Sequence, residues 1–485
     1  MMAAMAAVCA GAMAQALTFD ASSGERRTVV MPRGETVSYT AYEGLYYVTD
    51  VEDSAYQFMN VYVPDGADGQ TPIFMPNYVG GYMAAAARDI DAGDASGRAL
   101  SEGYVVAIAG ARGRNSRVGD TYTGRAPRGL LDLKAAVRYL RLFDDVMAGD
   151  AEMIITNGTS AGGAMSSLLG ASGNNPAYAD MLRAMGAADE RDDVFASVCF
   201  CPIVDLDHAD MAYEWLFQCT NNVSRPLTDE QLAVSEELAA LFPDYVNSLN
   251  LRKPDGSPLT ADNYMDYIKQ LLVESAQAAK DAGADIADTL GLVFSEGKKF
   301  AAPVNGGKRP MGATGAGPHE LPAMAMPASR GEYVVDIDAR AYLNYIVSTI
   351  RLKTPPAFDS QGVCSTSRPS GENEEMGDAQ GSSVNFTDYS AAKASTTVSD
   401  DVKENVRLLN PMRMMDDEGS TVARHWYIRH GARDRDTAFP VPINLATRLE
   451  NKGMEVSFKL PWDRPHSGDY ALDELFGWIK TVTAR

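Results

Sequence analysis

Residues 154–170 read Ile-Ile-Thr-Asn-Gly-Thr-Ser-Ala-Gly-Gly-Ala-Met-Ser-Ser-Leu-Leu-Gly. An apolar run typical of a β-strand leads into Gly158, Ser160 and Gly162, and a run of small and apolar residues typical of a helix follows. Strand, tight turn and helix with a serine at the apex form the G-x-S-x-G nucleophile elbow of α/β-hydrolases. A Cβ at either glycine would strike the neighbouring strand or helix. The pattern predicts Ser160 as the nucleophile and the N–H of Ala161 as an oxyanion donor; the alternative is a glycine-rich turn that merely tolerates serine.

Apolar runs and helical periodicity alternate along much of the chain. We expect strands at 58–63, 73–76, 104–109, 195–200, 425–429 and 456–460, and helices near 130–142, 441–449 and 471–481. Such alternation is typical of a mostly parallel sheet with helices on both faces. The predicted fold class is therefore α/β, an α/β-hydrolase fold with a large inserted lid domain.

The alternation stops after about residue 205. Residues 228–285 have helical patterns, whereas 297–331 and 355–398 are rich in Gly, Pro, Ser and Ala. We therefore expect a lid inserted between two late strands of the sheet. The predicted organisation is a signal-like leader at 1–16, hydrolase core at 17–204 and 401–485, and the lid domain at 205–400.

Composition excludes some classes of partner and gives no sign of a cofactor. The 485 residues carry a formal net charge of −22, which argues against binding to nucleic acid or an anionic membrane surface. No stretch is long and apolar enough to cross a bilayer. The five cysteines and five histidines show no zinc-binding spacing, so we expect no metal site and no cofactor. Cys199 and Cys201, two apart in an expected strand, are interpreted as buried thiols.

The N-terminus resembles the end of a secretory signal. Residues 1–16 are mostly small and apolar and include Ala-Met-Ala near Ala14, but they lack a basic start. We interpret them as a truncated signal peptide, which predicts a secreted or periplasmic protein. A disordered leader and a cytoplasmic location remain open, and the sequence does not predict an oligomeric state.

The acid and base of a catalytic triad are predicted from chain order. In α/β-hydrolases the order is Ser, then Asp or Glu, then His, with each group just past a late strand. Asp434 follows the expected strand 425–429 and His466 follows 456–460. His466 would accept the proton of Ser160, and Asp434 would orient its ring. His430 is the competing base, but it lies too close to its own strand end for Asp434 to orient it.

A second oxyanion donor is expected from an early loop. Residues 76–82, Pro-Asn-Tyr-Val-Gly-Gly-Tyr, follow an expected strand and contain paired glycines. We assign the N–H of Gly80, together with that of Ala161, to the oxyanion hole, with the register open by one residue. The alternative is a simple glycine turn.

Motifs in several separated places carry a family resemblance. They are the elbow, Ala-Ala-Asp-Glu-Arg-Asp-Asp-Val-Phe at 187–195, Asp-His-Ala-Asp-Met-Ala-Tyr-Glu-Trp at 207–215, His-Gly-Ala-Arg-Asp-Arg-Asp at 430–436 and Pro-His-Ser-Gly-Asp at 465–469. From about residue 40 onward the chain resembles bacterial tannases, which are grouped with subtype B carboxylesterases and feruloyl esterases. Fungal tannases place a cysteine pair next to the catalytic Ser and His, where this chain has Thr159 and Pro465.

The resemblance implies a substrate and the residues that bind it. In that family a lysine, a glutamate and the second aspartate of Asp-Arg-Asp hold the hydroxyls of a galloyl ring. The matching residues are Lys353, Glu372 and Asp436, although Glu374 or Glu375 could replace Glu372 because the preceding loop is longer than usual. The implied function is hydrolysis of the galloyl esters of tannins and alkyl gallates, small phenolic substrates, through an acyl-enzyme that releases gallic acid.

Three other functions are compatible with parts of the sequence. A feruloyl or general carboxylesterase would use the same triad with a lid adapted to other acids. A serine peptidase on this fold is disfavoured by the lack of propeller-type repeats and by the internal lid. A non-enzymatic adhesion protein would have a damaged triad, and this one is intact.

Overall fold

Nine strands form one sheet in the order β1-β2-β3-β5-β4-β8-β9-β12-β13. The computed structural model describes residues 16–286, 290–296 and 332–484. Six neighbouring strands of this sheet, β5, β4, β8, β9, β12 and β13, run parallel. At the other edge β1, β2 and β3 extend the sheet with antiparallel pairing. The strands are β1 (Glu25–Val30), β2 (Thr36–Tyr46), β3 (Phe58–Pro64), β4 (Pro72–Pro76), β5 (Val105–Ala109), β8 (Asp150–Thr159), β9 (Ala196–Phe200), β12 (His425–Arg429) and β13 (Glu455–Lys459). This mostly parallel sheet confirms the predicted α/β-hydrolase fold.

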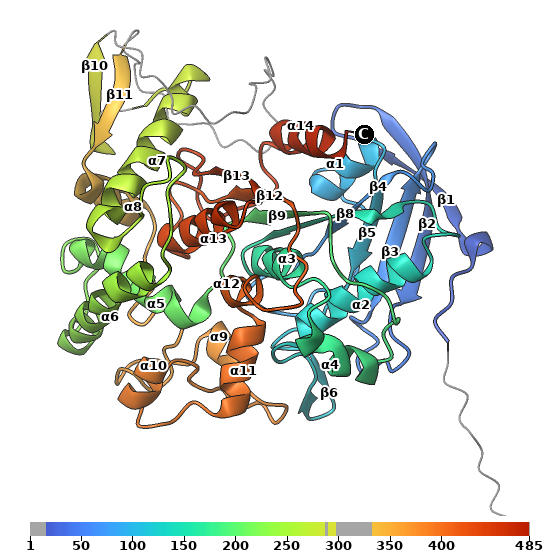
Figure 1. Cartoon of the computed structure of the whole chain (residues 1–485), viewed down its shortest axis with the longest axis horizontal. Helices are drawn as coiled ribbons and strands as arrows, with labels where there is room; N and C mark the ends of the chain where they lie inside the picture. Colours follow the sequence, from blue (N-terminus) through green and yellow to red (C-terminus); the bar gives the residue numbers. More distant parts are fainter. Residues whose placement is uncertain (1–15, 287–289, 297–331, 485) are drawn as a thin grey trace, which may run out of the picture.

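Helices cover both faces of the sheet (Figure 1). One face packs on α1 (Ala95–Ser101) and α14 (Leu472–Thr483), the other on α2 (Arg128–Leu142), α3 (Ala161–Ala171) and α13 (Pro440–Asn451). Alternate strand residues supply the two cores because side chains of a strand point to opposite faces. Ile155 belongs to the first core and its neighbour Ile154 to the second.

In the nine-stranded sheet, the strands missed by sequence reasoning are β1 and β2. They lie at the sheet edge and are largely exposed, with polar residues such as Glu25 and Arg26. Edge strands of this kind lack the apolar run by which a buried strand is recognised. The strand expected to hold both Cys199 and Cys201 ends one residue early, at Phe200, and Cys201 adopts a positive φ of 44° beyond it. Both thiols are buried, as predicted.

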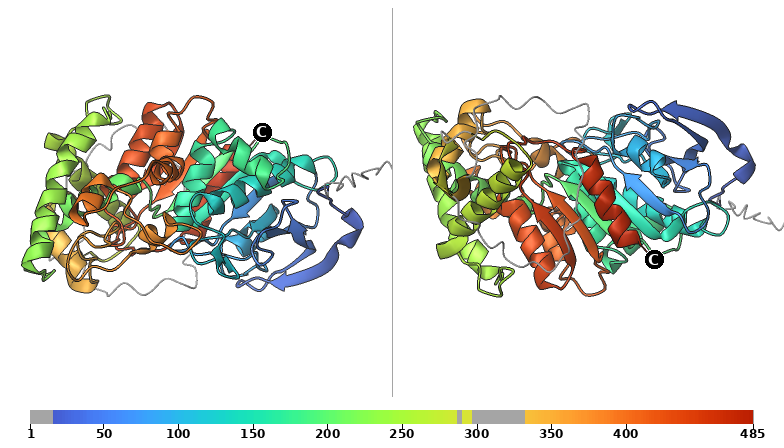
Figure 2. Two further views of the ribbon diagram at one scale, coloured as in Figure 1. Left: turned by 90° about the horizontal axis from the view of Figure 1, so that it is seen from below. Right: turned by 90° about the horizontal axis from the view of Figure 1, so that it is seen from above.

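Between β9 and β12, which are neighbours in the sheet, the chain forms a largely helical segment. Figures 1 and 2 show it at the β13 end of the sheet. Its elements are α5 (Leu206–Phe217), α6 (Asp229–Ser248), α7 (Ala261–Asp281), β10 (Leu292–Glu296), β11 (Glu332–Ile337), α8 (Ala339–Thr349), α9 (Gly371–Glu375), α10 (Asp388–Lys393), α11 (Asp400–Leu408) and α12 (Pro411–Met414). The boundaries of the lid domain stay a prediction, and residues 297–331 lie outside the described residues.

Three smaller elements complete the core: β6 (Arg117–Val118), β7 (Thr121–Tyr122) and α4 (Ala179–Ala184). Within the described part of the chain, no helix is both long enough and apolar enough to cross a membrane. The predicted leader lies outside the described residues except for Ala16.

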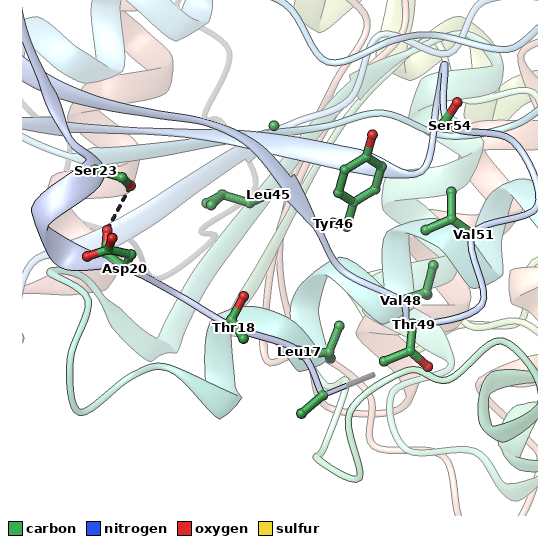
Figure 3. Close-up of a pocket in the computed structure, with 12 residues that line it drawn as sticks. Leu17, Thr18, Asp20, Ser23, Leu45, Tyr46, Val48, Thr49, Val51 and Ser54 are labelled. Carbon is green, nitrogen blue, oxygen red and sulfur yellow. Dashed lines mark hydrogen bonds between the residues drawn. The ribbon is translucent and has the colours of Figure 1, made fainter. Parts of the chain in front are cut away.

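A hollow of about 570 Å³ opens beside β2 (Figure 3). Leu17, Leu45, Tyr46, Val48 and Val51 supply its apolar lining. The hollow lies toward the β1 edge of the sheet, and none of the predicted site residues lines it. It is therefore separate from the candidate active site.

Candidate active site

The predicted catalytic residues gather at one end of the sheet. Ser160 directly follows β8, Gly80 follows β4, Asp434 follows β12 and His466 follows β13. These four strands run parallel, so their carboxyl ends meet at the same edge. Ligands of open α/β sheets bind at this edge.

The elbow holds Ser160 in a strained conformation. Its φ is 64° and its ψ is −124°, a region that non-glycine residues rarely adopt and that clusters at functional sites. The N–H of Ser160 donates to the Phe200 carbonyl at 2.9 Å, which fixes the turn to the next strand. A Cβ on Gly158 would collide with the Gly162 carbonyl, and one on Gly162 would lie 2.7 Å from the Val79 carbonyl. The glycines are therefore required by close packing.

The loop after β4 is bonded to the elbow. Asn77 Nδ2 donates to the Gly162 carbonyl at 3.0 Å. The Gly80 carbonyl accepts the N–H of Met83 at 3.0 Å and closes a turn. A Cβ on Gly80 would meet nothing within 4 Å, so the space beside this residue is open. The two candidate oxyanion donors, at Gly80 and Ala161, thus lie on segments that are bonded together.

Asp434 and His466 are joined by a hydrogen bond. The distance from His466 Nδ1 to Asp434 Oδ2 is 2.7 Å, and Asp434 Oδ1 accepts the N–H of Asp436 at 2.7 Å. Burial alone would raise the pKa of Asp434, but the neighbouring His430 and the bond from His466 lower it to about 2. Burial opposes charge on His466 as well, and the bond to Asp434 outweighs it and raises the pKa of His466. In this pair an ionised carboxylate accepts a hydrogen bond from Nδ1 of the imidazole, which leaves Nε2 to act as the base.

The loop that carries His466 rests on the elbow. A Cβ on Gly468 would collide with the side chain of Thr159, the residue before Ser160. Among the described residues, no hydrogen bond joins Ser160 Oγ to His466. Such bonds are often long in resting enzymes and tighten in the substrate complex.

His430, the competing base, is fully buried behind Asp434. Its Nδ1 lies 3.6 Å from Asp434 Oδ2, beyond hydrogen-bond distance, and its ring meets the Phe439 ring edge-on. Burial lowers the pKa of His430 to about 4, so it is uncharged at neutral pH. This placement favours His466 as the base.

Two of the three predicted ring-binding residues lie beside His466. A carboxylate oxygen of Asp436 lies within 4.8 Å of a ring nitrogen of His466 and its charge raises the pKa of His466, whereas the charge of Lys353 lowers it. Lys353 Nζ lies 4.0 Å from the centroid of the Phe358 ring, a cation–π contact that holds the ammonium. A carboxylate and an ammonium thus flank the candidate base.

Sequence reasoning missed Tyr213 on α5. Its hydroxyl donates to the Arg435 carbonyl at 2.7 Å and accepts the N–H of Lys353 at 3.1 Å. Arg225 Nη1 adds a bond to the Lys353 carbonyl at 3.2 Å. One hydroxyl therefore links the segment that carries Lys353 to the loop between Asp434 and Asp436. The motif at 207–215 contains Tyr213, but nothing local in it indicates this role.

The three candidate glutamates of α9 have different surroundings. Glu374 pairs with Arg114. Glu375 is fully buried, and burial raises its pKa to about 8. Glu372 lies near Tyr82, at the end of the loop that contains Gly80. Among the described residues, none of the three glutamates forms a hydrogen bond or ion pair with Lys353 or Asp436. Glu372 is favoured as the ring-binding glutamate, because Glu374 is paired with Arg114 and Glu375 is fully buried.

Comparisons with known proteins agree on one family. The family model described as BD-FAE matches residues 59–245. The crystal structure of Fusobacterium nucleatum tannase is 35% identical, with a TM-score of 0.81 over 96% of this chain and 99% of that chain. The tannin acyl hydrolase from Lactobacillus plantarum is 38% identical, with a TM-score of 0.82 over 96% of this chain and 98% of that chain. A tannin acyl hydrolase in complex with ethyl gallate has the same identity, TM-score and coverage. No curated protein sequence gives a significant match.

Proposed function

This chain belongs to the tannases, serine esterases of the α/β-hydrolase fold, and on that premise we propose that it hydrolyses galloyl esters of tannins and alkyl gallates. The observations that carry the proposal are that Asp436 lies within 4.8 Å of His466 and that the charge of Lys353 acts on the same imidazole. Adjacent ring hydroxyls offer several donors and acceptors, and an ammonium with carboxylates can satisfy them. An ester without those hydroxyls would leave the charged groups unpaired and bind poorly.

The proposed reaction has two steps. His466 takes the proton of Ser160 as its Oγ attacks the ester carbonyl, and Asp434 stabilises the resulting imidazolium. The N–H groups of Gly80 and Ala161 bind the developing oxyanion. His466 returns the proton to the leaving alcohol, which leaves a galloyl ester on Ser160. Water, activated by His466, then releases gallic acid.

The ring-binding proposal is tested with three esters. Initial rates on methyl gallate, methyl protocatechuate and methyl ferulate are compared for the wild type and Lys353→Ala. A hydrogen bond to a charged group contributes about 1.5–3 kcal/mol, so we expect kcat/KM to fall roughly 10- to 100-fold for the two hydroxylated rings. Methyl ferulate, which lacks the free adjacent hydroxyls, should change little.

Lys393→Ala is the matched control, because Lys393 pairs with Glu237 on the same inserted segment. It should leave all three rates unchanged. A uniform loss on all three esters in Lys353→Ala would contradict a ring-specific role and favour a general carboxylesterase.

A feruloyl esterase is the second candidate, favoured by the BD-FAE match at residues 59–245. It would gain support if the wild type cleaved methyl ferulate at least as fast as methyl gallate. We further propose that the protein is secreted or periplasmic, on the basis of the signal-like residues 1–16. N-terminal sequencing of the protein exported by its host tests that proposal, and retention of the leader would oppose it.

A further inference from the structure

We propose that Cys201, His430 and Asp434 form a buried inhibitory site for a thiophilic divalent cation such as Zn²⁺. One ligand atom of each residue lies within 4.8 Å of the other two, and all three side chains are buried. Cys201 follows β9, while His430 and Asp434 follow the adjacent β12. The site is separate from the proposed ester-binding groups, although it shares Asp434 with the triad.

His430 is the strongest sign that these residues form a ligand site. Its side chain has no exposed surface, yet neither Nδ1 nor Nε2 has a hydrogen-bond partner among the residues that the structure describes. A buried polar group without a partner is destabilising, and such groups in native proteins call for an explanation such as a water or an ion. The Phe439 ring holds the imidazole edge-on and so fixes it beside Asp434.

The donor set suits zinc. Thiolate, imidazole and carboxylate are its usual protein ligands, at about 2.0–2.3 Å. A tetrahedral ion with such bonds separates its nitrogen and oxygen ligands by about 3.3 Å. His430 Nδ1 and Asp434 Oδ2 are 3.6 Å apart. The Ser467 carbonyl, 3.5 Å from Cys201 Sγ, can supply a fourth ligand.

Cation binding at this site opposes catalysis. A metal on Asp434 Oδ2 competes with the 2.7 Å bond to His466 Nδ1. The imidazole then loses the group that orients it, so kcat falls while KM is unchanged. The metal binds the deprotonated thiolate of Cys201, whose proton passes to water. This loss of rate rests on the proposed triad, whereas the binding itself does not.

A second group of ligand atoms must be distinguished from this one. Asp434, Asp436 and His466 also lie within 4.8 Å of one another, so a cation there would inhibit too. Only the proposed site contains a thiol. Cd²⁺ bound to thiolate gives an ultraviolet charge-transfer band, and this band separates the two arrangements.

The experiment titrates the purified protein with Cd²⁺ and, in parallel, with Zn²⁺. The variants are Cys201→Ser, the control Cys199→Ser at a second buried thiol, and Asp436→Asn. Activity is followed on a nitrophenyl ester, because galloyl hydroxyls bind metals themselves. We expect the band, a higher melting temperature and loss of kcat in the wild type, Cys199→Ser and Asp436→Asn.

Cys201→Ser should retain metal-free activity, lose the band and require at least tenfold more metal for inhibition. Melting curves without metal verify that each variant is folded. The proposal is overturned if the wild type shows no band, if Cys201→Ser keeps it, or if Asp436→Asn alone abolishes inhibition. A band without any loss of kcat would retain the site and contradict its inhibitory role.

Discussion

The candidate catalytic residues at the sheet edge and Lys353, the proposed ring-binding residue of the inserted segment, are held in different ways. Ser160 and the Asp434–His466 pair stand at strand ends, where backbone bonds of one sheet fix their positions. Lys353 stands between α8 and α9 and is fixed by side-chain bonds from Tyr213 and Arg225. Apart from Asp436, which follows β12 and is bonded to Asp434, the proposed ring-binding residues therefore have a support separate from the sheet, so a mutation should be able to damage substrate choice without damaging the proposed triad.

The largest effect is expected from Asp434→Asn, which changes the catalytic edge alone. Without the carboxylate the imidazole loses its favoured tautomer, and losses of about 10⁴-fold in kcat are typical of such a change. The loss should be equal for esters with and without ring hydroxyls. Steady-state kinetics on methyl gallate and methyl ferulate measure it.

The same variant has a pH signature. His466 must be neutral to accept a proton, and the bond to Asp434 raises its pKa, so wild-type activity is lost as pH falls through that raised value. Removing the carboxylate charge lowers the pKa of His466 and moves the acid limb of the pH–rate profile to lower pH. Asp463→Asn, in the neighbouring loop, is the control. An unmoved acid limb in Asp434→Asn would contradict the pairing.

Tyr213→Phe tests the link between the two regions. It removes two hydrogen bonds, each contributing about 1 kcal/mol, so kcat/KM for methyl gallate should fall about 5- to 30-fold. Methyl ferulate should be affected less, because the chemistry at Ser160 does not depend on Lys353. Tyr389→Phe, which removes a surface hydroxyl bonded to Glu237, should change neither rate. Equal losses on both esters would show that Tyr213 supports the catalytic loop rather than substrate choice.

The smallest effect on activity is expected from Glu375→Gln, which should alter stability instead. Burial raises the pKa of Glu375 to about 8, above its ordinary value, so the folded state keeps a proton that the unfolded state gives up. Stability is lost as pH rises from about 5 through 8, by an amount on the order of a few kcal/mol. Gln cannot ionise, so the variant should lose less. Melting temperatures at pH 5 and pH 8 measure the difference.

Glu374→Gln, which breaks the pair with Arg114, is the control for that experiment. It should keep the wild-type pH dependence of stability. Glu372→Gln should instead lower kcat/KM on methyl gallate with little change in melting temperature. If Glu375→Gln has that phenotype, the ring-binding glutamate is Glu375.

The candidate catalytic residues could largely be predicted from the sequence. The strands that precede them are buried apolar runs, and the candidate residues lie in the loops that follow these strands. The strand 425–429 was expected with the bounds that β12 has. Chain order alone predicts Asp434 and His466 as the acid and the base. Ser160 was recognisable because close packing permits only glycine at positions 158 and 162.

The inserted segment could not be predicted in the same way. Glu372, Glu374 and Glu375 lie on a single helical turn, and only burial and the Arg114 pair distinguish them. Tyr213 acts through a hydroxyl that joins residues far apart in the chain. The convergence of Cys201 with His430 was invisible for the same reason, because neither residue lies in a metal-binding motif.

The contact between Gly468 and Thr159 has a consequence for the environment in which this protein can work. Fungal tannases place cysteines beside the catalytic Ser and His, whereas here a threonine side chain packs against backbone. Packing of this kind does not depend on the redox state of the surroundings. This contact between the histidine loop and the elbow therefore has the same geometry available to it in a reducing medium as in an oxidising one.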